Sequence, residues 1–162
     1  MVAEGKRWKV GAAGAVVHGD RVLMVRHTYG EKKGRWALPG GYATHDERLD
    51  QTVVREVWEE TGLNAKVVDV IGLRTRYTER GAQVFVLFRL TPVSGQPEPD
   101  GVEVDRTAWL SAPEVATMDD GDMLPVARNA ALAALKGGTG LEEDRRFPGR
   151  DETYRGFLLA WE

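Results

Sequence analysis

Cysteine is absent from this 162-residue sequence. Its absence excludes disulfide bonds, thiolate zinc sites and cysteine nucleophiles. Serine is almost as scarce, because Ser94 and Ser111 are the only two in the chain, and both lie in segments that predict loop or cap positions. The three histidines are also isolated from one another: His18 is predicted in a turn, and His27 and His45 in loops. A surface role is the simplest prediction for each.

Long apolar runs and an excess of positive charge are missing too. No stretch approaches the roughly 18 apolar residues needed to cross a bilayer, and the first ten residues, MVAEGKRWKV, contain no apolar signal core. A net charge of −3 and a pI near 5.7 argue against broad electrostatic binding of nucleic acid. We therefore expect a cytoplasmic protein that binds neither membranes nor nucleic acid.

What the chain does have is a pattern of alternating strands and helices in one domain of ordinary size. We predict a domain over residues 1–136, followed by an extension over residues 137–162. The predicted helices span residues 47–61 and 122–136, and a turn at residues 79–81 separates two of the strands. The predicted strands span residues 8–17, 21–26, 36–38, 65–76, 82–90 and 107–110, and residues 92–100 form a loop. This order predicts an α/β fold, a mixed sheet with helices on both faces.

Three glutamates gather on one side of the first predicted helix. Glu56 and Glu60 are four residues apart, and Glu59 lies one turn from Glu56. Like charges at this spacing destabilise an isolated helix, whereas a divalent cation turns their repulsion into a binding site. A solvated acidic surface is the plainer interpretation of such a run.

The surrounding residues favour the cation. Residues 41–63, GYATHDERLDQTVVREVWEETGL, fit the pattern G-x5-E-x7-R-E-U-x-E-E-x-G-U, where U is a bulky aliphatic residue. A chance match is on the order of 10⁻¹⁰ per register. The segment resembles the Nudix box, and by this segment the chain resembles members of the Nudix hydrolase superfamily.

This resemblance implies an α/β/α sandwich and a Mg²⁺-dependent hydrolase, with Mn²⁺ as a substitute. It further implies that the substrate is a nucleoside diphosphate linked to another moiety and that its pyrophosphate bond is cleaved. Two alternatives remain: an enzyme that removes non-standard nucleoside triphosphates, and a nucleotide sensor that does not catalyse. The implied metal ligands are the backbone carbonyl of Gly40 and the carboxylates of Glu47, Glu56, Glu59 and Glu60.

The resemblance also assigns the remaining roles. Arg55 is expected to hold a glutamate in place through its planar fork. Family members place the general base either in the box or on a later loop, so Glu56 and Glu103 both remain candidates. The segment before the box borders the substrate cleft in this fold, which makes Arg26, Tyr29 and Arg35 the predicted substrate contacts.

The end of the chain has a pattern of its own. After the glycine-rich break at residues 137–140, the sequence is charged until it becomes abruptly apolar and aromatic over residues 154–161. Apolar clusters of this kind usually mark a docking surface. We predict that residues 154–161 pack on the domain or on a second subunit of a homodimer.

Overall fold

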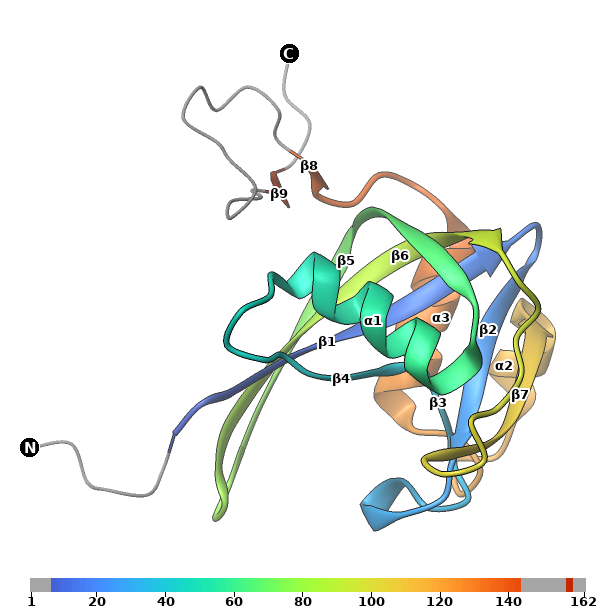
Figure 1. Ribbon diagram of the computed structural model, residues 1–162. Helices are drawn as coiled ribbons and strands as arrows, with labels where there is room; N and C mark the ends of the chain where they lie inside the picture. Colours follow the sequence, from blue (N-terminus) through green and yellow to red (C-terminus); the bar gives the residue numbers. More distant parts are fainter. Residues whose placement is uncertain (1–6, 144–156, 159–162) are drawn as a thin grey trace, which may run out of the picture.

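The computed structural model describes residues 7–143 and 157–158. The strands are β1 (Lys9–His18), β2 (Arg21–His27), β3 (Trp36–Ala37), β4 (Gly40–Tyr42), β5 (Asn64–Thr78), β6 (Gly81–Ser94), β7 (Val104–Ser111), β8 (Glu142–Glu143) and β9 (Phe157–Leu158). The helices are the 3₁₀ turn η1 (Gly30–Lys32) and the α-helices α1 (Leu49–Thr61), α2 (Ala112–Thr117) and α3 (Pro125–Lys136). Figure 1 shows α1 on the near face of the sheet and α3 behind it.

Strand β1 is the centre of the sheet. It runs parallel to β6 along one edge, and on its other edge it is antiparallel to β4 at its start and to β2 at its end. Strand β5 extends the sheet beyond β6 as a long hairpin, while β2 also pairs with β3 and β7. The sheet is therefore mixed, as the sequence predicts.

Alternation along β1 builds one core on each face of this sheet. Ala12 and Val16 pack with Val53 and Val57 of α1, whereas Ala15 packs in a second cluster with residues of α2 and α3. Successive side chains of a strand point to opposite faces, so a single apolar strand can serve both clusters. The predicted α/β/α sandwich is confirmed.

Helix α1 follows its sequence signals closely. Val53 and Val57 are fully buried, and Leu49 packs beside them, which confirms the predicted stripe. At the start of the helix, Gln51 Oε1 accepts a 2.9 Å hydrogen bond from the Arg48 backbone N–H. At its end, Gly62 adopts φ 69°, a left-handed C-cap that a side chain would strain. The caps fix where α1 begins and ends, and its buried stripe fixes which side faces the sheet.

Several predicted boundaries differ from the structure. Helix α1 begins at Leu49 rather than residue 47, and α3 begins at Pro125 rather than residue 122. Strand β6 continues through Pro92, which was expected to begin a loop. Pro92 lies beyond Leu90, the last residue of β6 paired with β1, so the missing N–H removes no bond to that strand.

Several short elements were not predicted, among them strand β4 and helix α2. Strand β4 contains two glycines, which weaken any strand signal. Helix α2 has a readable signal, because Glu114 Oε2 accepts hydrogen bonds from both the backbone N–H and the hydroxyl of Ser111, each at 2.8 Å. This Ser-x-x-Glu capping box, with Pro113 in the first turn, marks a helix start.

No helix within the described ranges is long and apolar enough to cross a membrane.

The chain beyond α3 is attached to the outer strand of the hairpin. The carboxylate of buried Asp69 in β5 receives hydrogen bonds from Arg89 of β6 and from the Gly140 backbone N–H at 2.8 Å. Leu141 and Val70 exchange two backbone hydrogen bonds of 2.9 Å. Further on, Phe157 packs against the α1-side core, with its ring centroid 5.7 Å from that of Phe88.

Of the segment predicted to dock, only Phe157 and Leu158 are among the described residues, so its packing stays a prediction. We expect truncation after Gly138 to lower the free energy of unfolding by about 2 kcal/mol, because the Asp69 contact to Gly140 and the Phe157 packing are lost together. Thermal melting measures the change, and light scattering shows whether a dimer becomes a monomer. Phe157→Ala should reproduce part of the loss, and Val93→Ala, at an exposed position, serves as the control. An unchanged melting point with an unchanged mass would reject the prediction.

Candidate active site

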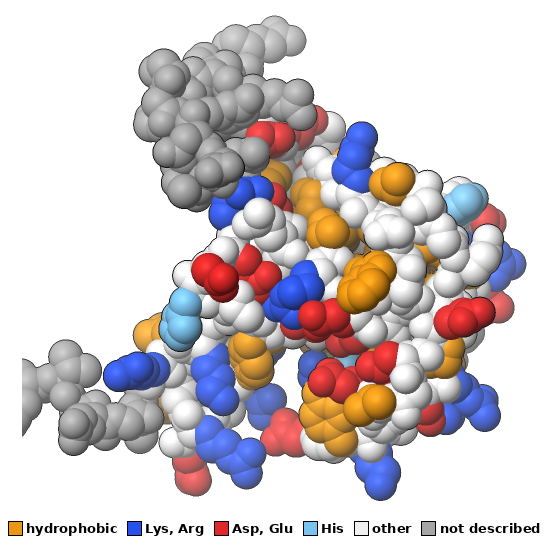
Figure 2. All heavy atoms as spheres, viewed as in Figure 1, with side chains coloured by type: hydrophobic (Ala, Val, Ile, Leu, Met, Phe, Trp, Pro, Cys, Tyr) orange, Lys and Arg blue, Asp and Glu red, His pale blue; other side chains and the backbone are white. Residues whose placement is uncertain are grey.

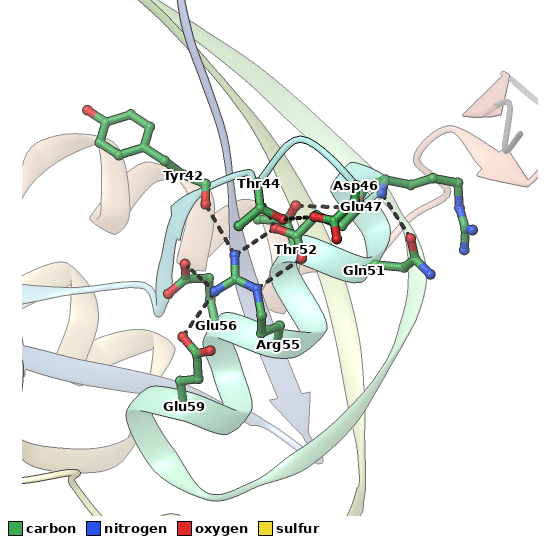
Figure 3. Close-up of polar contacts among 10 residues, drawn as sticks. Tyr42, Thr44, Asp46, Glu47, Gln51, Thr52, Arg55, Glu56 and Glu59 are labelled. Atoms are coloured by element: carbon green, nitrogen blue, oxygen red, sulfur yellow. Dashed lines mark hydrogen bonds and ion pairs between the residues drawn. The ribbon is translucent and has the colours of Figure 1, made fainter. Parts of the chain in front are cut away.

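The guanidinium of Arg55 is the centre of the site (Figure 3). Its Nε and Nη2 donate to the two carboxylate oxygens of Glu47 at 2.9 and 2.7 Å. Its Nη1 donates to Glu56 at 2.9 Å and to Glu59 at 3.0 Å, and Nη2 also donates to the Tyr42 carbonyl at 3.2 Å. One side chain thus fixes three carboxylates and the end of β4.

Glu47 is bound to Arg55 rather than facing the other glutamates freely. Both of its oxygens accept from Arg55, and Oε1 also accepts from the Thr44 backbone N–H at 2.9 Å. These hydrogen bonds, those from Arg55 first, lower the pKa of Glu47 to about 2. Glu47 therefore stays ionised and anchors Arg55, while its predicted direct role as a metal ligand stays a prediction.

Glu56 and Glu60 are the buried members of the cluster. Glu60 is 2% exposed, and its Oε2 has no hydrogen-bond partner among the described residues. Burial, followed by the charge of Glu56, raises the pKa of Glu60 to about 9, against the opposing effects of Lys32 and a Gly40 backbone hydrogen bond. Burial likewise raises the pKa of Glu56, although Arg55 opposes the shift. An unpartnered carboxyl oxygen in such a place is costly unless a ligand completes it.

The two glycines of β4 allow its backbone to lie directly against Glu56 and against strand β1. A Cβ on Gly41 would lie 2.3 Å from Glu56 Oε1, and one on Gly40 would lie 2.4 Å from the Ala12 carbonyl oxygen. Any side chain at either position would displace the carboxylate or the neighbouring strand. The two glycines therefore keep the backbone of β4 directly beside the carboxylates of α1.

The donor set fits a hard divalent cation. The carboxylates of Glu56 and Glu60 offer oxygen atoms only, and such ligands suit Mg²⁺ or Mn²⁺. The backbone of Gly40 contributes a hydrogen bond to Glu60, and its carbonyl as a metal ligand stays a prediction. Within residues 7–143 and 157–158, no three His, Asp or Glu side chains already stand in a metal-binding arrangement. Arg55 holds Glu56 and Glu59, so the carboxylates are gathered on one face without all converging on one point.

The loop before β3 brings further groups to the same place. The Tyr29 hydroxyl donates to Glu103 Oε2 at 3.2 Å. The charges of Glu103, Glu60 and Glu56 all act on Tyr29 and on the exposed Lys32, so both residues lie near the acidic cluster. Tyr29 and Glu103 were predicted from the sequence. Lys32 was missed, because nothing in the sequence distinguishes it from Lys33.

Other predicted substrate contacts have partners elsewhere. Arg26 forms a bidentate pair with Asp105 at 2.9 and 2.6 Å. Arg35 donates to the carbonyls of Asp120 and Met123 at 2.7 and 3.1 Å, which ties β3 to the segment before α3. The guanidinium groups of Arg26 and Arg35 thus have protein partners, and their contacts with a substrate stay predictions.

The expectation of a surface role for His27 is wrong. His27 is 4% exposed, and burial lowers its pKa to about 4, so it is neutral at physiological pH.

Comparison with known proteins identifies the family. The NUDIX domain model matches residues 8–130, which include every side chain of this site. The chain belongs to the Nudix hydrolase family. The resemblance of residues 41–63 to the Nudix box is thereby confirmed.

Named relatives agree with this assignment. A MutT-like protein from Streptomyces ambofaciens is 40% identical over 108 residues, which cover 66% of each chain. Human nucleoside diphosphate-linked moiety X motif 6 is 30% identical over 134 residues, which cover 80% of this chain and 42% of that protein. The matched region of this chain thus spans 66% of the length of the first relative and 42% of the length of the second.

A solved structure shares the fold. The MutT NUDIX hydrolase from Burkholderia pseudomallei superposes with a TM-score of 0.69 over 78% of this chain and 97% of that one, at 20% sequence identity. At this identity the likeness extends to the fold alone.

Proposed function

We propose that this Nudix protein hydrolyses the pyrophosphate bond of a nucleoside diphosphate linked to another moiety, in the cytoplasm, with Mg²⁺ as the cofactor. The observation that carries the proposal is the buried carboxyl group of Glu60, which has an unpartnered oxygen and lies beside Glu56 and the backbone of Gly40. The substrate class is supported by the human relative, which is named for nucleoside diphosphate-linked moieties.

Each residue of the cluster has a proposed task. Glu56, Glu60 and the Gly40 carbonyl would hold Mg²⁺, with Glu59 in support and Mn²⁺ as an alternative ion. Bound there, the cation supplies charge neutralisation for the pyrophosphate group and acidifies the attacking water. Arg55 keeps Glu56 and Glu59 oriented, and Glu47 in turn fixes the guanidinium.

Two carboxylates remain candidates for the general base. Glu56 is buried and accepts a hydrogen bond from Arg55, while Glu103 accepts one from the Tyr29 hydroxyl. The base takes the proton of the water that attacks phosphorus, so it must reach that water. Glu103→Gln separates the two: a large fall in kcat with unchanged Mg²⁺ binding assigns the base to Glu103, and near-normal kcat assigns it to the box.

A panel of nucleotides tests the function itself. With Mg²⁺, the wild-type protein is expected to cleave at least one nucleoside diphosphate derivative, such as a nucleoside diphosphate sugar, and EDTA is expected to abolish the reaction. Phosphate released by a coupled phosphatase is the readout. Preferential cleavage of nucleoside triphosphates would instead favour the sanitising role. Tight binding across the panel without cleavage, in either Mg²⁺ or Mn²⁺, would show a sensor and reject the proposal.

A further inference from the structure

One row of paired residues crosses four strands of the sheet beside the acidic cluster. Gly11 of β1 pairs with Tyr42 of β4 on one side and with Phe85 of β6 on the other. Phe85 in turn pairs with Arg74 of β5. Paired residues of neighbouring strands point to the same face, so Tyr42, Phe85 and Arg74 lie together there. This is the face opposite α1, because Leu87, two residues beyond Phe85, packs in the cluster formed with α2 and α3.

The side chains of this row are in contact with one another. The rings of Tyr42 and Phe85 meet edge to face, with their centroids 5.3 Å apart. The guanidinium of Arg74 lies over the Phe85 ring, with its central carbon 4.8 Å from the centroid. Gly11 leaves room for this arrangement, since a Cβ there would lie 2.6 Å from Phe85 Cζ. Tyr42, Phe85 and Arg74 therefore form one continuous platform of two rings and a planar cation.

The platform is accessible, and its cation has no protein partner. Tyr42 is 43% exposed and Arg74 is half-buried, whereas Phe85 beneath them is buried. In the part of the chain that the structure describes, the Arg74 side chain forms no hydrogen bond or ion pair, while Arg76 on the same face pairs with Glu31 at 3.2 Å. Below α1 and beside the β5–β6 hairpin, Figure 2 shows basic, acidic and apolar side chains around a hollow. The guanidinium of Arg74 thus has one plane on Phe85 and offers the other plane to a ligand.

Strand β4 connects the platform with the glutamates. Among the described strands β4 pairs only with β1, and the backbone groups on its other edge face the acidic cluster. The Tyr42 carbonyl accepts from Arg55 at 3.2 Å, and the Gly40 backbone forms a hydrogen bond with Glu60. Gly40 and Tyr42 are two residues apart, which is roughly 7 Å along a strand. A ligand whose pyrophosphate lies beside Glu60 therefore reaches the platform with its next group, which in a nucleotide is the nucleoside.

We propose that the platform binds the nucleoside part of the substrate, with the base stacked on the guanidinium plane of Arg74 and against the Tyr42 ring. The proposal rests on the proposed function, since it takes a nucleoside diphosphate derivative as the ligand. Bases stack well on arginine planes and aromatic rings. Because stacking does not depend on the hydrogen-bonding edge of a base, the platform selects nucleotides over other diphosphates without selecting one base.

Calorimetric titration in the presence of Mg²⁺ tests the proposal without any cleavage. The ligands are the methylene analogues of the four common nucleoside diphosphates, whose bridging carbon resists hydrolysis, and methylenediphosphonate, which lacks the nucleoside. Wild type is expected to bind the tightest nucleoside analogue at least tenfold more tightly than methylenediphosphonate. Arg74→Ala should weaken that analogue about five- to a hundredfold, the range for one stacked base. Its affinity for methylenediphosphonate should stay within about twofold of wild type.

Three further variants identify the cause of the loss. Arg74→Lys keeps the charge but not the plane, so it should resemble Arg74→Ala. Tyr42→Leu keeps the carbonyl that Arg55 binds but removes the ring, and it should also weaken the nucleoside analogue. Arg80→Ala, in the exposed turn between β5 and β6, is the control and should bind both ligands as wild type does.

The outcomes separate this proposal from the proposed function. Equal affinity of wild type and folded Arg74→Ala for the nucleoside analogue would overturn the proposal, as would a wild type that does not prefer the nucleoside. An equal loss for methylenediphosphonate, or recovery in Arg74→Lys, would show that Arg74 binds phosphate and would reject the stacking role. If nucleoside binding depends on Arg74 but wild type cleaves no nucleotide, the platform stands while the hydrolase assignment fails. Cleavage by wild type without any dependence of binding on Arg74 leaves the hydrolase assignment and rejects the platform.

Discussion

Replacing Glu60 with glutamine is expected to lower kcat by about a thousandfold or more, because Lewis-acid stabilisation of the reacting phosphate contributes several kcal/mol. Glu60 is the most deeply buried carboxyl group of the cluster, and its Oε2 has no partner among the described residues. Glutamine keeps the shape of the side chain but is a far poorer ligand for Mg²⁺. Glu56→Gln should behave in the same way. Steady-state kinetics at saturating substrate and Mg²⁺ measure the effect.

The free energy of unfolding of Glu60→Gln should rise at neutral pH, although its kcat falls. In the metal-free protein the pKa of Glu60 is raised from 4.5 to about 9, so the folded state binds a proton that the unfolded state releases. The unfolding free energy of wild type should therefore fall as pH rises from about 4.5 towards 9. Glu60→Gln removes this dependence, and the variant should melt at a similar temperature near pH 5 and at a higher one near pH 8.

The control is Glu79→Gln, which changes an exposed glutamate in the turn between β5 and β6. It should leave both kcat and the pH dependence of melting unchanged. Near-normal kcat in both Glu56→Gln and Glu60→Gln would refute the metal assignment, whatever the melting temperatures.

Arg55→Lys is expected to lower kcat by about ten- to a hundredfold, the range observed when groups that orient metal ligands are changed. Lysine keeps the positive charge but cannot hold Glu47, Glu56 and Glu59 at once, as the guanidinium does. The freed carboxylates then lose the orientation that the site requires. Arg80→Lys, in the exposed hairpin turn, is the matched control. Kinetics indistinguishable from the control would show that the Arg55 network has no catalytic consequence.

The same variant should lose stability, by about 1–2 kcal/mol for the charged hydrogen bonds that lysine does not replace. The pH dependence identifies the cause. The pKa of Glu47 is lowered to about 2, so its pairing with Arg55 contributes fully above the ordinary glutamate value of 4.5 and is lost as pH falls through about 2. The difference in melting temperature between wild type and Arg55→Lys should be constant from pH 6 to 8 and shrink below pH 4.

The sequence predicts the helix of the site better than the space around it. The spacing of Leu49, Val53 and Val57 and the glycine at position 62 suffice to place α1, because periodicity and capping are local properties. The common side of Glu56 and Glu60 follows from the same helix geometry. Their burial does not, since it depends on β4 lying directly over them, and β4 is a short glycine-containing strand paired with β1.

Contacts between distant segments explain the remaining differences. The charge of Arg35 and its place in the loop before β3 suit a substrate contact, but its guanidinium donates to carbonyls of the segment before α3. His27 is the last residue of β2, a strand whose residues 22–25 are buried on both faces, and it is buried although the residues after it are polar. Glu31 in η1 pairs with Arg76, a residue 45 positions away. Pairings of this kind leave no periodic signal in the sequence.

Titration of the metal-free protein with Mn²⁺, followed by calorimetry, tests the central claim most directly. The claim is that Glu56 and Glu60 of α1 bind a divalent cation beside the backbone of Gly40. It predicts saturable binding to wild type and to Glu79→Gln with equal affinity, and at least a tenfold loss of affinity in Glu60→Gln, with competition by Mg²⁺. Equal Mn²⁺ affinity in wild type and in folded Glu60→Gln would contradict it.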